Sequence, residues 1–269
     1  MGDTYTHGHH ASVLRSHEWR TAENSAAYLL PRLRAGARLL DVGCGPGTVT
    51  VDLAERVVPG PVLGIDASTD VVDRARARAA SRSESDEIDV RFEVGDVYAL
   101  DRDDGAFDVV HAHQVLQHLT DPVAALVEMR RLLAPGGILA VRDSDYGGFV
   151  WSPADDRLTR WLELYHQVTA RNGAQADAGR HLGAWVRVAG FADIEISTST
   201  WTFADPDSRS WWGELWADRV QQSAFAAQAV EYELADNAEL AAIADGWRAW
   251  AADPYAFFCV LHAEVLALR

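Results

Sequence analysis

Short apolar runs alternate along the first half of the chain with longer segments in which apolar residues recur every three or four positions. The short runs predict buried strands, and the longer segments predict amphipathic helices. Up to residue 145 the expected strands are 38–42, 62–66, 88–94, 107–111 and 137–142. The expected helices are 48–57, 70–80, 116–119 and 123–133. This alternation predicts a parallel sheet with helices on both faces.

Beyond Asp143 the order of the elements changes. The pattern there predicts helices at 157–171 and 179–189, a strand at 191–203, a long helical stretch at 208–250 and a last strand at 256–266. We therefore expect an α/β fold with a seven-stranded sheet. A helical insertion at about 205–253 separates its last two strands.

The first predicted strand runs directly into a loop with glycine at every second position, Gly43, Gly45 and Gly47. Glycines let backbone N–H groups approach a ligand closely and let the chain turn sharply into a helix. A dinucleotide fingerprint would need a further glycine at Thr48, and a phosphate loop would need Lys-Ser/Thr after the last glycine. The loop therefore suits a nucleoside with a charged amino-acid tail and no phosphates.

Polar residues stand at the carboxyl ends of the predicted strands, where ligands of open α/β sheets bind. Strand one contains Asp41, strand two ends at Asp66, Asp96 follows strand three, and strand four runs into residues 111–114. A carboxylate at Asp66 can accept hydrogen bonds from both ribose hydroxyls. Asp96 can accept from an adenine amino group while Val97 offers its backbone N–H to the ring, and Asp41 can face an ammonium group.

These residues resemble the class I S-adenosylmethionine-dependent methyltransferases, which have a Rossmann-like sheet, and within them the ubiquinone-biosynthesis-like branch (methyltransferase types 11 and 25). The resemblance covers roughly residues 20–145. It rests on Leu-Leu-Asp-Val-Gly-Cys-Gly-Pro-Gly-Thr at 39–48, Gly-Ile-Asp at 64–66, Gly-Asp-Val at 95–97, Phe-Asp-Val-Val-His-Ala-His-Gln-Val-Leu-Gln-His-Leu at 107–119 and Leu-Ala-Pro-Gly-Gly at 133–137. Together these motifs are specific, whereas any one of them alone is weak.

The resemblance implies the cofactor S-adenosyl-L-methionine, the product S-adenosyl-L-homocysteine and the strand order 3-2-1-4-5-7-6 with an antiparallel seventh strand. It implies that the loop glycines border the methionine tail and that His113 lies on the sulfonium side. It also divides the chain into an N-terminal helical cap (1–36), a cofactor-binding core (37–145) and a C-terminal part with the acceptor-binding insertion (146–269). The predicted cofactor-binding residues are Arg20, Asp41, Gly43, Gly45, Gly47, Asp66, Ala67, Asp96, Val97, His113 and Gln114.

Residues 15–31 and 142–148 look similar to a narrower group that includes fungal enzymes methylating dithiol natural products. By this resemblance Arg20 would sit on an N-terminal helix that folds over the cofactor, where its guanidinium could clamp the methionine carboxylate as a bidentate pair. An arginine on an amphipathic helix is also commonly a solvated surface residue. Both interpretations stay open.

Methyl transfer from a sulfonium requires the nucleophile and the methyl group to be aligned and water to be kept out, and it needs no metal. A hydroxyl or carbon acid benefits from a general base, whereas a thiol with a pKa near 8.5 supplies thiolate largely on its own. Candidate bases are His118, Asp145, Tyr146 and His166. Helix initiation, turn capping or pocket lining explain these residues equally well, so no catalytic base is assigned.

Nine of the ten tryptophans lie from Trp151 onward. Trp211, Trp212 and Trp216 stand at the start of the insertion, and Trp247 and Trp250 stand at its end. Trp212 and Trp216 share a helix face because they are four residues apart, so they could wall an aromatic or apolar acceptor pocket. Packing of that face on the sheet is an equally good explanation for each residue. The asymmetry of the whole set favours a pocket.

Composition narrows the class of partner. The formal charge of −16 (40 acidic and 24 basic residues) argues against nucleic acid and anionic membranes. Two cysteines, Cys44 and Cys259, fit a reducing cytoplasm, and no apolar stretch is long enough to span a membrane. His7, His9 and His10 resemble a metal-binding cluster, but a mobile polar terminus explains them better.

We therefore expect a cytoplasmic methyltransferase, a monomer or homodimer, which methylates a small apolar or aromatic acceptor at oxygen, carbon or sulfur in secondary metabolism. An S-methyltransferase acting on a thiol or dithiol natural product is an alternative. A cofactor-binding regulator or partner protein without turnover is an alternative of another class, which the intact glycines and strand-end acids disfavour. A nucleotide-modifying enzyme is disfavoured by the charge and by His111-Ala-His-Gln, which replaces an Asn/Asp-Pro-Pro-aromatic motif after strand four.

Overall fold

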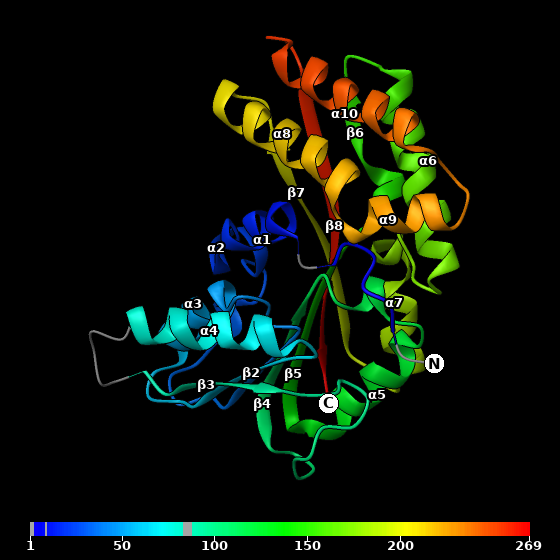
Figure 1. Cartoon of the computed structure of the whole chain (residues 1–269). Helices are drawn as coiled ribbons and strands as arrows, with labels where there is room; N and C mark the ends of the chain where they lie inside the picture. Colours follow the sequence, from blue (N-terminus) through cyan, green and yellow to red (C-terminus); the bar gives the residue numbers. More distant parts are fainter. Residues whose placement is uncertain (1–2, 9, 83–87) are drawn as a thin grey trace.

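The computed structural model describes residues 3–8, 10–82 and 88–269, and its centre is one sheet with strand order β3-β2-β1-β4-β5-β8-β6 (Figure 1). β7 pairs with the free edge of β8. Without the short β6, this is the expected order 3-2-1-4-5-7-6, which is confirmed. The strands are β1 (Leu39–Val42), β2 (Val62–Asp66), β3 (Val90–Val94), β4 (Phe107–His113), β5 (Leu133–Ser144), β6 (Val150–Ser152), β7 (Ile194–Phe203) and β8 (Phe257–Leu268).

The direction of the last strand also agrees with the expectation. β1 runs parallel to β2 and β4, while β8 is antiparallel to both β5 and β7. β6 pairs with the start of β8, where Val150 lies opposite Cys259. Three residues are too few to show a hydrophobic period, so the sequence pattern gave no sign of this strand.

Helices cover both faces of the sheet because neighbouring strand residues point to opposite sides. Leu39 faces a cluster that includes Leu53 of the helix over 48–57, and Leu40 faces a cluster that includes Leu126 of the helix over 122–132. The helices are α1 (Ala11–Glu18), α2 (Ala22–Ser25), α3 (Thr48–Val57), α4 (Thr69–Arg82), α5 (Pro122–Leu132), α6 (Asp156–Arg171), α7 (Ala178–Val188), α8 (Pro206–Gln222), α9 (Ala224–Glu231) and α10 (Asn237–Ala252). No helix in the described ranges is long and apolar enough to cross a membrane.

The insertion between β7 and β8 is divided into three helices, where the pattern predicts one long helical stretch. α8 begins at Asp205, whose side chain accepts from the Ser208 N–H, with Pro206 at the first helical position. α10 begins in the same way at Asp236, whose side chain accepts from the Glu239 N–H. These caps satisfy backbone donors that the start of a helix would otherwise leave unpaired.

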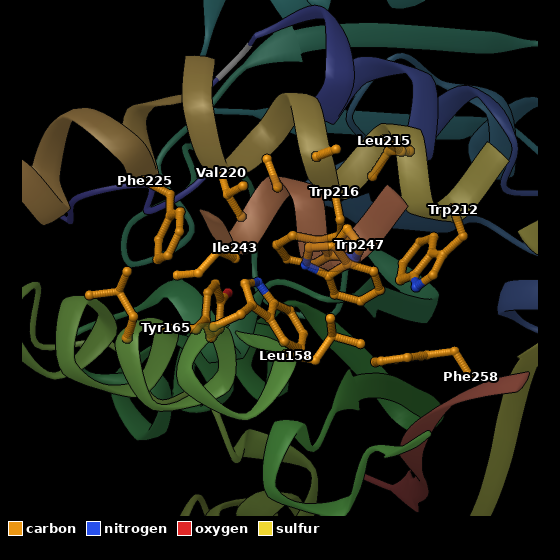
Figure 2. Packing of buried hydrophobic residues seen from close by; sticks show 14 of the residues in the cluster. Leu158, Tyr165, Trp212, Leu215, Trp216, Val220, Phe225, Ile243, Trp247 and Phe258 are labelled. Atoms are coloured by element: carbon orange, nitrogen blue, oxygen red, sulfur yellow. The ribbon is translucent and has the colours of Figure 1, made fainter. Parts of the chain in front are cut away.

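Helices α6, α8, α9 and α10 gather at one end of the sheet (Figure 1) and enclose a second, aromatic core. Figure 2 shows Trp216 of α8 beside Trp247 of α10, and their rings stack with centroids 5.7 Å apart. Tyr165 of α6 faces Trp216 edge-on. Burial of several large aromatic side chains supplies the apolar area that holds this helical layer on the sheet.

The N-terminal segment differs from expectation in two ways. Arg20 lies in the connection between α1 and α2 rather than on a helix. His7 is 5% exposed, so the prediction of a mobile polar terminus is wrong for this residue. Its Nε2 lies 3.0 Å from the Tyr165 hydroxyl and 3.3 Å from the Tyr146 hydroxyl, which satisfies a buried polar atom. His10 caps α1, and His9 lies outside the described residues.

Candidate functional site

A cavity of about 760 Å³ opens at the carboxyl ends of β1, β2 and β4, where the topology of an open α/β sheet places its ligand. Its volume is in the range of small-molecule sites. Apart from Gly47, all predicted cofactor residues line it: Arg20, Asp41, Gly43, Gly45, Asp66, Ala67, Asp96, Val97, His113 and Gln114. The aromatic residues Trp212 and Trp216 of the insertion line the same cavity.

The glycine loop needs glycine for its backbone. Gly43, Gly45 and Gly47 have φ angles of 66°, 55° and 79°, in the left-handed region that other residues adopt at a cost. A Cβ on Gly43 would also lie 2.4 Å from Cγ2 of Val115. Gly47 differs from expectation, because a Cβ there would meet Ala75 and Phe92 rather than the cavity. Its role is to start α3.

Asp66 holds the loop in place. One carboxylate oxygen accepts from the Gly45 N–H at 3.2 Å, and the other accepts from the Ser68 N–H at 3.0 Å. Asp96 is exposed at the rim and accepts from the Tyr98 N–H at 2.9 Å. Both carboxylates keep lone pairs for a ligand, since a carboxylate oxygen can accept more than one hydrogen bond.

Asp41 is buried, and both of its oxygens are used inside the protein. One accepts from the Thr50 hydroxyl at 2.5 Å, and the other lies 2.7 Å from Nδ1 of His111. The carboxylate thus ties β1 to β4 and α3. Because it also borders the cavity, its negative charge favours a cationic group there.

Arg20, Gln114 and His262 form a hydrogen-bonded chain. Nη2 of Arg20 donates to Oε1 of Gln114 at 2.5 Å. Because an arginine can only donate, the Gln114 amide nitrogen must face His262 Nε2, 2.8 Å away, and donate to it. His262 therefore carries its proton on Nδ1. Burial lowers the pKa of Arg20 to about 10, so the guanidinium stays charged at neutral pH.

His113 is the last residue of β4, and its ring centroid lies 6.0 Å from that of His262. Burial, reinforced by the positive charge of Arg142, lowers its pKa well below the usual value, so it is neutral at physiological pH. Its ring centroid lies 5.6 Å from that of Trp201. Nε2 of His113 is buried and has no hydrogen-bond partner within the described ranges.

The far end of the cavity is aromatic. Tyr146, Phe149, Trp212 and Trp216 line it, together with His7 from the N-terminal segment. Trp212 and Trp216 also pack in the aromatic core, so the pocket and the packing interpretations hold together. Trp211, Trp247 and Trp250 are not among the residues that line the cavity. Tyr5 and His7 were missed, because no motif marks a residue that reaches the site from a terminal segment.

The four candidate bases fall into two pairs, of which only one pair lines the cavity. Asp145 is held by two hydrogen bonds from the Arg180 guanidinium, and His166 pairs with Asp177 away from the cavity. Tyr146 and His118 line the cavity. Burial raises the pKa of Tyr146 and lowers that of His118 to about 3. Neither group has a pKa near 7, where a general base works best.

Comparison with known proteins identifies the family. The family model described as "Methyltransferase domain" matches residues 33–199. An uncharacterized methyltransferase of Schizosaccharomyces pombe is 32% identical over 97% of this chain and 95% of its own length. The probable methyltransferase ltbC of Aspergillus luteorubrus is 32% identical over 99% of this chain and 98% of its own length. The chain is a class I S-adenosylmethionine-dependent methyltransferase.

A solved structure agrees with the fold of this methyltransferase. Phosphoethanolamine N-methyltransferase 2 of Haemonchus contortus, solved with S-adenosyl-L-methionine, superposes with a TM-score of 0.56. The match covers 90% of this chain and 51% of that one at 18% identity, so it speaks for the fold alone.

The residues of the methyltransferase fit the cofactor. Apart from its chain neighbours, a Cβ at Gly45 would have only Nδ1 of His17 within 4 Å among the described residues, at 3.7 Å, so ligand atoms have room beside this loop. Buried Nε of Arg20 has no acceptor in the described ranges, which suits a ligand carboxylate. When bound, S-adenosylmethionine supplies a methyl group activated by a sulfonium.

Proposed function

We propose that this methyltransferase acts on a small aromatic or apolar acceptor of secondary metabolism, at oxygen, carbon or sulfur. The observation that carries the proposal is the aromatic wall of Tyr146, Phe149, Trp212 and Trp216, which lines the same cavity as the glycine loop. Flat aromatic side chains favour apolar and aromatic ligands through burial and ring contacts. Asp3, Tyr5 and His7 of the N-terminal segment line the same cavity and help to exclude water, as methyl transfer requires.

Cofactor binding, in this proposal, divides among the residues around the loop. Arg20 binds the methionine carboxylate, and Asp41 provides negative charge for the ammonium. Asp66 accepts from the ribose hydroxyls, and Asp96 and Val97 bind the adenine. His113 lies beside the sulfonium, where a neutral imidazole adds no repulsion.

S-methylation is a second candidate. It is supported by the state of the candidate bases, because neither His118 nor Tyr146 is poised to remove a proton near neutral pH. A thiol needs less help, since a group with a pKa near 8.5 is partly ionised in neutral solution. Acceptors that ionise on their own are therefore favoured over alcohols.

The test is incubation of the purified protein with methyl-labelled S-adenosylmethionine and matched sets of phenols, quinols and dithiols at pH 7 to 9. We expect label in an aromatic acceptor. Label confined to dithiols, with a rate that rises with the thiolate fraction, would establish the second candidate. No transfer to any member of the three sets, by protein that binds S-adenosylhomocysteine, would contradict the acceptor class.

A further inference from the structure

Arg219 of α8 is a buried cation in the aromatic end of the cavity. The residue is 4% exposed and lines the cavity. Its Nη2 donates to the Ser12 carbonyl at 3.2 Å and to the Ser16 hydroxyl at 2.9 Å. Its guanidinium lies 4.5 Å from the ring centroid of Trp216. These are neutral partners, and the described chain gives Arg219 no ion pair.

The guanidinium is also incompletely hydrogen-bonded. Nε of Arg219 is buried and has no acceptor in the part of the chain that the structure describes. A tie between α1 and α8 would explain the bonds of Nη2 but not this free donor. Burial of an unpaired charge is costly, and a buried donor without an acceptor adds to the cost. A ligand with an anionic group would offset both the cost of the unpaired charge and the cost of the unpaired N–H donor.

The groups around Arg219 cannot supply that negative charge. The groups that couple to it electrostatically include Tyr146, Tyr5 and Tyr165. Burial raises the pKa of Tyr5 to about 12 and raises those of the other two phenols, so all three are protonated at neutral pH. Burial lowers the pKa of His7 well below its usual value, so this histidine is neutral.

The cofactor cannot neutralise Arg219 either. Arg20 is a second cation on the cavity without an ion pair among the described residues, and the single carboxylate of the cofactor is matched to it. The sulfonium and the ammonium of S-adenosylmethionine add positive charge. Of the acidic residues that line the cavity, Asp41, Asp66 and Asp96 lie at or just after the ends of strands β1, β2 and β3. The fourth, Asp3, is exposed and accepts from the N–H and the hydroxyl of Thr120. The acceptor end therefore has an unmatched positive charge.

We infer that the acceptor is an aromatic acid whose carboxylate binds the Arg219 guanidinium inside the aromatic chamber. This inference rests on the proposed function and narrows its acceptor class. A carboxylate fits the planar donors of arginine, and a charge-assisted bond in a water-poor cavity is stronger than a neutral one.

The experiment uses binding rather than turnover. Protein saturated with S-adenosylhomocysteine, so that Arg20 is occupied, is titrated with benzoate and benzamide and with cinnamate and cinnamamide by calorimetry. Each pair matches ring and shape and differs in charge. We expect each acid to bind at least tenfold more tightly than its amide. In Arg219→Gln this preference for the acid should vanish. Arg219→Lys should keep part of it, because lysine keeps the positive charge but lacks the two parallel N–H donors of the guanidinium.

Arg15→Gln is the matched control. Arg15 lies on α1 near the same helix pair, but it is 47% exposed and pairs with Asp218 outside the cavity. This variant should keep the preference for the acids, and all variants should keep their affinity for S-adenosylhomocysteine.

Equal binding of acid and amide by the wild-type protein, or no measurable binding of either acid, would overturn the inference. Equal weakening of acid and amide in Arg219→Gln would overturn it too, because that result means a packing role. If Arg219→Gln does not fold, the acid-to-amide ratios of the wild type and of Arg219→Lys decide. Failure to methylate any aromatic compound would contradict the proposed function instead, and this binding readout does not depend on it.

Discussion

Nη2 of Arg20 donates a hydrogen bond to Oε1 of Gln114 at 2.5 Å, joining two residues that are 94 positions apart in the chain. The contact brings the segment before α2 onto the end of β4. Gln114 adopts a φ of 55°, which is unusual for a residue with a side chain. Its amide nitrogen donates a second hydrogen bond, to Nε2 of His262. A charged group is thereby fixed at the edge of the proposed cofactor site.

Replacing Arg20 should weaken cofactor binding. Arg20→Gln removes the cation proposed to bind the methionine carboxylate, and a hydrogen bond to a charged group contributes about 1.5–3 kcal/mol. We expect the Kd for S-adenosylhomocysteine to rise about tenfold or more, measured by calorimetry. Arg34→Gln, an exposed arginine outside the cavity, is the control and should bind like the wild type. Unchanged affinity in Arg20→Gln would refute the proposed clamp.

Gly43→Ala should destabilise the fold more than the same change at Gly36. Both glycines have positive φ, but a Cβ on Gly36 would meet no described atom within 4 Å beyond its chain neighbours, whereas one on Gly43 would overlap Val115. A left-handed alanine costs about 1–2 kcal/mol, and overpacking adds about 1–3 kcal/mol. Urea unfolding measures both. Val115→Ala should recover part of the loss in Gly43→Ala; equal losses at the two glycines would argue against the overlap.

Asp66→Asn should weaken the binding of S-adenosylhomocysteine about tenfold or more. The amide keeps one acceptor oxygen but places its NH2 group where one of the two loop N–H groups, that of Gly45 or that of Ser68, now finds an acceptor, and leaving such a donor unpaired costs about 1–3 kcal/mol. Asp73→Asn is the control, because Asp73 is an exposed carboxylate of α4 that pairs with Arg76 outside the cavity. Calorimetry on both variants tests this, and equal affinities would exclude a binding role for Asp66.

The free energy of unfolding should decrease as the pH is lowered below about 6.5, partly because of His118. Burial lowers its pKa to about 3, so the unfolded chain takes up a proton near pH 6.5 and the folded chain does not. The folded state therefore loses up to about 1.4 kcal/mol per pH unit for this group as the pH falls from 6.5 toward 3. In His118→Gln, urea unfolding between pH 6.5 and 5 should give a shallower slope. Parallel curves would show that His118 does not carry this dependence.

Local pattern was enough to place every strand except β6, together with the glycine loop and the strand-end acids. Asp41, Asp66 and the loop glycines lie next to their strands in sequence, and a parallel sheet brings the strand ends to one edge. Resemblance to the family supplied what local pattern does not, namely the order of the strands and the direction of the last one. β6 was missed because three residues show no period.

Contacts across long sequence separations could not be predicted. Gly47 has the spacing of a ligand-binding glycine, but its α carbon packs toward Phe92 on β3. His7 has the sequence context of a mobile tail, yet it is buried, and its Nε2 lies within hydrogen-bond distance of the hydroxyls of Tyr146 and Tyr165. A spacing of four put Trp212 and Trp216 on one helix face without saying whether that face meets the cavity or the core. In the folded chain Trp212 and Trp216 both line the cavity and both pack in the aromatic core.

The sequence by itself determined the fold class, the cofactor and the edge of the sheet where the cofactor is proposed to bind. These features depend on the backbone conformation and the side chains of residues that are close together in the sequence. Only the tertiary structure decided which distant side chains complete the acceptor end. Whether a cation such as Arg219 is solvated or buried depends on what packs over it, and that is settled by the insertion helices and the N-terminal segment folding against each other.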